Sequence, residues 1–239
     1  MGCVKSHSEP VVDSQSAISL IVSGDPQLFA IVRLSLLVTL SATVLAALVG
    51  LPLGAVVALA RFPGRSAIVV AMNALMGLPP VVAGLLVFLT LSRSGPLGSF
   101  GLLFTAKAMI AAQALLIVPV IGALTRQVIA DLWEEYRDEL TAMGVSGPAR
   151  VQALLWDARF AVATILLAGF GRAAAEVGAV MIVGGNIDGH TRVMTTAIAL
   201  ETSKGNLALA ISLGFVLIAI VMAVNALVWC VREWSERHA

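Results

Sequence analysis

The sequence predicts an all-α integral membrane protein, and two properties of the chain point to this class. Of its 239 residues, 59% are hydrophobic and 12% are charged, whereas soluble domains carry about 25% charged residues. The chain therefore lacks the polar residues that would cover a water-soluble exterior. Its apolar residues also form continuous runs, whereas the strands of a membrane β-barrel alternate between apolar and polar positions.

Five of these runs are long enough to cross a hydrocarbon core about 30 Å thick, which takes roughly 20 residues of helix. In chain order, the predicted spans are residues 33–60, 66–91, 104–125, 159–183 and 207–231. Residues 17–32 are apolar too, but Gly24, Asp25 and Pro26 interrupt them. We expect them to form a short interfacial helix that leads into the first span.

The domain organisation follows from these runs. We predict a polar N-terminal tail over residues 1–16 and a transmembrane domain over residues 17–232. Residues 233–239 form a short tail, and residues 132–156 form a polar segment between the third and fourth spans.

Lysine and arginine residues in short loops predict the orientation, because cytoplasmic loops carry an excess of them. One side collects eight: Arg61, Arg65, Arg126, Arg137, Arg150, Arg159, Arg232 and Arg237. The other side has six: Lys5, Arg33, Arg93, Lys107, Arg192 and Lys204. We therefore expect a multi-pass protein of the bacterial plasma membrane, with the polar segment and the C-terminus in the cytoplasm.

The second span is interrupted by adjacent prolines, Pro79 and Pro80, in the stretch "LPPVVAG". Proline removes a backbone donor and bends a helix. Within a membrane this is tolerated where protein or a water-filled path satisfies the freed carbonyl groups. The pair is either a packing kink or part of a translocation path.

The fourth span holds the charges that lie deepest in any apolar run, Arg172 and Glu176. They are four residues apart, so one helix face presents both and they can pair. Intramembrane charges usually face a bundle interior or a cavity. A structural ion pair and a gate in the path both fit. Gly184 and Asn186, in the turn that follows, are further candidates for the path.

The polar segment contains "LWEEYRDELTAMGVSGPAR", with four acidic residues between 134 and 139 and a small-residue turn from Gly144 to Pro148. It lies on the basic side of the membrane. A polar, helical segment of this kind is suited to binding a cytoplasmic partner.

Three classes of function were weighed against these features. An intramembrane enzyme needs a converging catalytic set, which the sequence does not show. An ion-coupled carrier usually has several intramembrane carboxylates, whereas Glu176 is the one found here. A pump subunit remains, and because the sequence has no G-x-x-x-x-G-K-[ST] phosphate loop, its ATPase must be a separate protein. The net charge of +1 gives no indication of nucleic acid binding.

Residues 138–156, "DELTAMGVSGPARVQALLW", resemble the cytoplasmic motif of type I ABC importer permeases. Asp138 takes the place of the motif's glutamate and Gly144 that of its glycine, while Trp156 and Asp157 replace the usual Leu-Pro ending. Residues 78–84, 95–98 and 171–205 resemble the molybdate/tungstate branch, and the tungstate type most of all. The resemblance covers residues 17–232.

The resemblance implies a homodimer in which each subunit binds one cytoplasmic ATPase, and that ATPase binds ATP and Mg²⁺. A periplasmic or lipid-anchored binding protein would deliver the oxyanion, which moves by alternating access. The chain itself is then neither an enzyme nor the holder of a cofactor or metal. The residues expected to couple it to the ATPase are Asp138, Glu139, Ala142, Met143, Gly144 and Val145.

The resemblance also implies a substrate, with tungstate expected first and molybdate next. An importer of sulfate or another oxyanion is the close alternative. An ATP-independent channel or carrier is the remote one.

Overall fold

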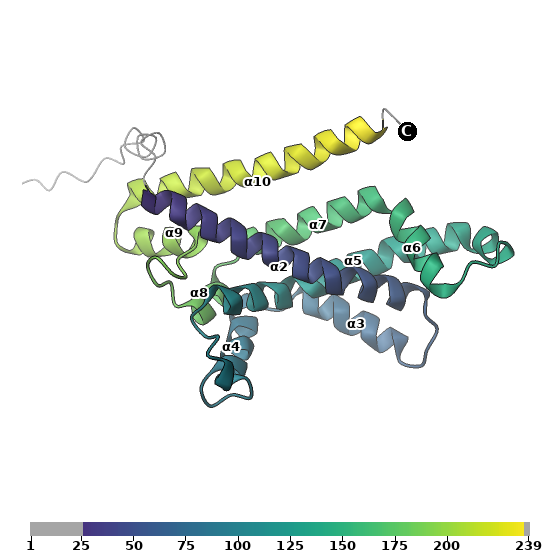
Figure 1. The fold of residues 1–239 in the computed structure, drawn as a ribbon, viewed down its shortest axis with the longest axis horizontal. Coiled ribbons are helices and arrows are strands. Elements are labelled where there is room, and N and C mark those ends of the chain that lie inside the picture. Colours follow the sequence, from purple (N-terminus) through teal and green to yellow (C-terminus); the bar gives the residue numbers. More distant parts are fainter. Residues whose placement is uncertain (1–25, 237–239) are drawn as a thin grey trace, which may run out of the picture.

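The computed structural model describes residues 26–236, and this part of the chain is helical with no strand (Figure 1). Its helices are α2 (Pro26–Leu59), α3 (Arg65–Met76), α4 (Pro80–Leu91), the short 3₁₀ helix η1 (Gly98–Phe100), α5 (Ala106–Ala142), α6 (Gly147–Asp157), α7 (Arg159–Ala174), α8 (Gly178–Gly184), α9 (Met194–Ser203) and α10 (Leu207–Glu236). The predicted all-α membrane class is confirmed. The predicted N-terminal tail and the last three residues lie outside the described residues.

Three helices are long and apolar enough to cross a membrane within residues 26–236, namely Leu28–Leu59, Ala106–Ala142 and Leu207–Cys230. Two bent helix pairs bring the number to five if each pair counts as one span. The predicted number of spans therefore agrees with the upper figure, whereas several predicted boundaries do not.

The first boundary that differs is the interfacial helix. Residues 26–32 are the beginning of α2, which runs without a break to Leu59, and residues 17–25 are not described. Pro26 explains the difference, because proline is tolerated in the first turn of a helix, where its missing N–H has no partner to lose.

The second predicted span has the interruption expected at Pro79 and Pro80, but it is a break between two helices rather than a bend in one. It divides into α3 and α4, which meet at 104° across residues 77–79. Pro79 has an extended backbone and Pro80 is the first residue of α4. Because neither proline can donate to the preceding turn, the chain ends one helix and begins another rather than bending a single one.

The fourth predicted span ends early, because α7 stops at Ala174 and α8 begins at Gly178. The third predicted span, in contrast, extends far beyond Thr125. It is the first part of α5, whose 37 residues correspond to a length of about 55 Å. Since this exceeds the hydrocarbon thickness, we expect one end of α5 to project from the membrane.

The core of the bundle forms where α2 and α5 lie side by side (Figure 1). Ala42 and Ala46 of α2 are buried with Ile117 and Ile121 of α5. A Cβ atom added to Gly50 would lie 2.9 Å from the Cγ2 atom of Ile121, so the small residues of α2 permit this close approach. Small residues serve the same purpose at helix interfaces in membranes generally.

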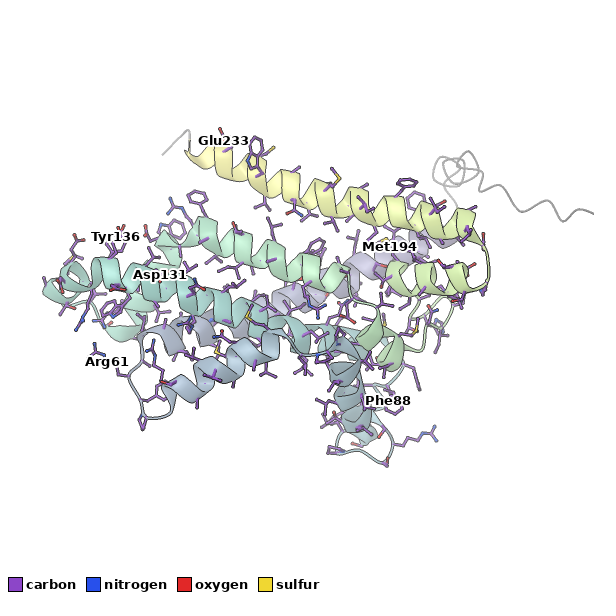
Figure 2. All side chains as sticks on the ribbon, turned by 180° about the vertical axis from the view of Figure 1, so that it is seen from behind. Arg61, Phe88, Asp131, Tyr136, Met194 and Glu233 are labelled. Carbon is purple, nitrogen blue, oxygen red and sulfur yellow. The ribbon has the colours of Figure 1, made fainter. Side chains whose placement is uncertain are left out.

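The two ends of the molecule differ. In Figure 2, Arg61, Tyr136 and Glu233 lie towards one end, while Phe88 and Met194 lie towards the other. The loop after α2, the end of α5 and the C-terminal part of α10 thus share one end, as the distribution of basic residues predicts.

Candidate functional site

The short helices α4 and α8 form the first part of the candidate site. A Cβ atom on Gly84 of α4 would lie 2.7 Å from the Cα atom of Ala179 in α8, and one on Gly178 would lie 3.1 Å from Cγ2 of Val81. The backbones are therefore as close as glycine allows. This contact brings the Pro79–Pro80 break next to the start of α8, which begins two residues after Glu176.

Glu176 is the centre of this region. Its side chain is 3% exposed and its Oε2 atom lies 3.2 Å from Nη1 of Arg172, whose side chain is 34% exposed. Glu176 Oε1 accepts a hydrogen bond of 2.9 Å from the backbone N–H of Ala179, and its carbonyl oxygen accepts one of 2.8 Å from Thr195. The predicted ion pair is thus present, and Glu176 also connects α7, α8 and α9.

Gly184 and Asn186 lie at the other end of α8, which has seven residues. Gly185 and Asn186 both have positive φ, at 70° and 49°. The Asn186 side chain donates to the carbonyl of Thr196 at 3.4 Å. Among the hydrogen bonds of the described residues, none joins this turn directly to Arg172 or Glu176. The predicted path residues therefore form two groups, one at each end of α8.

A buried polar residue that the sequence analysis missed lies near the ion pair. Gln113 of α5 is 3% exposed and donates to the carbonyl of Ala173 at 3.1 Å. Its Oε1 atom is buried and has no hydrogen-bond partner among the described residues. It lines a cavity of about 20 Å³ with Ser35, Thr39 and Thr195, which is room for one water molecule. The sequence did carry a signal for this buried polar residue, namely a glutamine inside the third predicted span.

The predicted coupling residues lie at the end of the molecule where α5 projects. Residues 132–156 are not one helix: α5 ends at Ala142, a turn follows, and α6 begins at Gly147. Gly144 has a φ of +65°, and a Cβ atom there would meet nothing within 4 Å. Met143 is 67% exposed. Of the six predicted coupling residues, five are exposed and Val145 is half-buried: Asp138, Glu139, Ala142, Met143 and Gly144 are the exposed ones.

Buried contacts hold the end of α5 and α6 together as a hairpin. Leu140 and Leu154 are buried in one cluster. The Arg150 guanidinium lies 4.4 Å from the centre of the Trp133 ring and donates to the carbonyl of Val145 at 3.2 Å. The turn between the helices is therefore fixed from within, while its outer side is free to contact a partner.

Trp156 is the residue of this region that the sequence analysis did not include among the coupling residues. Its side chain is 73% exposed at the end of α6. Exposed aromatic residues are enriched in protein interfaces relative to other surface. We name the exposed residues Met143, Gly144 and Trp156 the coupling surface.

Comparisons with known proteins decide the family. No protein-family model matches the chain. A tungstate uptake system permease protein, TupB of Peptoclostridium acidaminophilum, is 41% identical over 223 residues, covering 92% of this chain and 96% of the relative. The chain belongs to the permease subunits of anion ABC transporters.

Other relatives agree with this family. A probable anion ABC transporter permease protein of Haloferax volcanii is 42% identical over 205 residues, covering 84% of this chain and 88% of the relative. Sulfate transport permeases match this permease at 26–28% identity and are more distant. The predicted resemblance to the permeases of oxyanion ABC importers is confirmed, whereas the roles of individual site residues stay predictions.

Proposed function

We propose that this permease subunit imports tungstate, with molybdate as the next candidate, driven by a separate ATPase that docks on the coupling surface. The observation that carries the proposal is the α5–α6 hairpin, which projects from the apolar bundle and exposes Trp156 and Met143. Such residues are costly to leave in water. A partner that covers them explains their exposure.

The ATPase would bind ATP and Mg²⁺, because this chain has no phosphate loop in its sequence. The chain would then contribute no ATP hydrolysis of its own. The basic loops at the end of the molecule that carries the hairpin support a cytoplasmic position for it. Closure of the ATPase pair would move the two hairpins together and change the side to which the path opens.

The path would bind its oxyanion weakly, since a site that bound strongly would not release its cargo. Arg172 supplies a positive charge, and the pairing with Glu176 at 3.2 Å tempers it. The break before α8 lies beside this pair, and the break before α4 packs against it. Tight capture would belong to a periplasmic or lipid-anchored binding protein.

A second copy of the chain would complete the membrane part. Only 17% of an apolar 18-residue stretch of α10 is buried within one chain. A groove of about 570 Å³ between α7 and α10 contains Thr164 and Asn225, whose side chains bond to carbonyl oxygens of their own helices. Polar side chains next to lipid favour a protein neighbour, so this groove supports a homodimer.

Sulfate is the alternative to these two substrates, because sulfate permeases also match the chain. The test is uptake of tungstate into proteoliposomes that hold the permease, its ATPase and its binding protein. We expect uptake that requires ATP, is reduced by excess molybdate and is unchanged by excess sulfate. Competition by sulfate would assign the sulfate alternative, and uptake without ATP would contradict the role of the ATPase.

A further inference from the structure

A pocket of about 160 Å³ lies at the opposite end of the molecule from the coupling surface, between the first turns of α2 and the loop before α9. Its lining includes Arg33, Leu34 and Leu37 of α2, and Asp188 and Arg192 of the loop. It is separate from the path residues described above. Two arginines and one carboxylate leave the pocket with an excess of positive charge.

The loop and α2 are held together next to the pocket. The backbone N–H of Met194 donates to Oγ of Ser35 at 2.7 Å, and both groups are buried. Ser35 is two residues from Arg33 and Met194 is two residues from Arg192. This bond therefore keeps the two arginine-bearing segments side by side.

Within the described part of the chain, the donors of the two arginines are only partly used. Nη1 of Arg192 lies 3.1 Å from Oδ1 of Asp188, and the Arg192 side chain is 17% exposed. Nε of Arg192 is buried and has no hydrogen-bond partner among the described residues. Across those residues, no carboxylate lies within ion-pair distance of Arg33. An anion with several oxygens can accept from both side chains, as charge-assisted bonds to guanidinium groups favour.

The position of the pocket relates it to the membrane surface. After Arg33, toward the C-terminal end of α2, the exposed face of the helix continues with Leu37, Leu40, Val44 and Leu48. These positions are spaced by three or four residues, so they form one stripe along the helix. Arginine near the end of such a stripe reaches toward the headgroup level. The positively charged pocket therefore lies at one end of the apolar stripe of α2.

We propose that Arg33 and Arg192 bind a tetrahedral oxyanion in this pocket. The ligand has the chemistry of a phosphate group, carried by an anionic lipid headgroup or free in solution. With a lipid, the acyl chains would follow the apolar stripe of α2. Asp188 competes with the ligand for Arg192 and keeps the site from binding too tightly.

The test uses the assembled complex purified in detergent and two probes. Retention of phosphatidylglycerol is measured by native mass spectrometry, and binding of radiolabelled inorganic phosphate by equilibrium dialysis. We expect the double variant Arg33→Gln/Arg192→Gln to lose binding of one probe by about tenfold, the effect of roughly 1.4 kcal/mol. The matched control is Arg93→Gln, an exposed arginine outside the pocket, which should bind as the unaltered chain does.

The result identifies the source of the oxyanion. Loss of phosphatidylglycerol alone assigns a lipid headgroup, and loss of phosphate alone assigns a dissolved anion. Asp188→Asn, which removes the competing carboxylate, should strengthen binding of the same probe. Equal binding of both probes by the double variant and by Arg93→Gln would overturn the proposal, as would unchanged or weaker binding in Asp188→Asn.

Discussion

Gly144 shows how one residue can connect backbone geometry to energy coupling. Its φ of +65° is costly for residues with a Cβ atom, by about 1–2 kcal/mol. The space beyond its Cα is open. Alanine at this position therefore adds backbone strain alone, whereas tryptophan adds the same strain together with bulk on the coupling surface.

We predict that Gly144→Trp lowers substrate-stimulated ATP hydrolysis well below that of Gly144→Ala. The reason is that the added ring prevents the ATPase from approaching the hairpin. Hydrolysis is measured in reconstituted complexes at equal protein content. If the two variants hydrolyse ATP at the same stimulated rate, the turn is not part of the contact.

Arg172 compensates a carboxylate that is 3% exposed. Arg172→Ala leaves that carboxylate with the N–H of Ala179 as its remaining donor among residues 26–236. We expect a loss of about 1–3 kcal/mol in stability, less than the 3–5 kcal/mol of fully buried pairs because Arg172 is partly exposed.

The double variant Arg172→Ala/Glu176→Gln removes the uncompensated charge and should recover part of this stability. Thermal unfolding of the two variants in the same detergent measures the recovery. Equal melting temperatures would contradict an uncompensated Glu176 charge in Arg172→Ala. Recovered stability together with uptake that stays low in the double variant would separate a role in transport from one in folding.

Glu201 gives a prediction on pH. The hydrogen bond from the Lys204 ammonium, at 3.0 Å, and a second from Asn206, at 3.1 Å, hold the pKa of the Glu201 carboxyl below its ordinary value. A carboxyl group whose pKa is lowered by folding stabilises the fold at pH values above its ordinary pKa. This stabilisation is lost as the pH falls through the lowered pKa.

We therefore expect the melting temperature to fall less on acidification in Glu201→Gln than in the unaltered chain. Melting is followed from about pH 7 to about pH 3, a range that spans the ordinary carboxyl pKa values. Lys204 is 53% exposed, so the difference should be small and should shrink in high salt. Identical acid dependence in both proteins would show that the pairing does not stabilise the corner between α9 and α10.

At the scale of elements, the close contact of α4 with α8 is the most specific feature of the membrane part. Gly84→Ala places a methyl group 2.7 Å from the Cα atom of Ala179, so the helices must separate at a cost of about 1–3 kcal/mol. Gly171→Ala is the matched control, because it also lies in a helix and its Cβ would meet nothing within 4 Å.

We expect Gly84→Ala to lower the melting temperature and the rate of uptake, and Gly171→Ala to leave the melting temperature equal or raise it slightly. Both are measured in the same reconstituted complex. A Gly84→Ala variant as stable and active as Gly171→Ala would contradict the close packing of α4 on α8.

The sequence predicted elements where the deciding signal is local. The adjacent prolines at 79 and 80 marked a helix break, and the spacing of Arg172 and Glu176 predicted their pairing. It did not predict the 104° angle between α3 and α4, because that angle depends on how α4 packs against α8. The cavity beside Gln113 was missed for the same reason, since its walls come from distant parts of the chain.

At the scale of the whole molecule, the arrangement separates two tasks. The hairpin of α5 and α6 lies at one end, while α4, α8 and α9 lie toward the other (Figure 1). The 37 residues of α5 connect the two ends in a single helix. We expect a displacement of the hairpin to be carried along this helix to the region around Gln113 and the ion pair.

The contact between the hairpin and the ATPase is the central claim, and site-specific cross-linking tests it most directly. Cysteine is placed at Trp156, or at Phe100 in η1 as a similarly exposed control at the other end. The natural Cys3 and Cys230 are first replaced by serine. The assembled complex is then treated with a short thiol-to-amine cross-linker.

We predict that the ATPase subunit becomes linked to the permease through Trp156→Cys and not through Phe100→Cys. Linkage through Phe100→Cys alone, or no linkage through Trp156→Cys in a complex that still hydrolyses ATP, would contradict the assignment of the α5–α6 hairpin as the coupling surface.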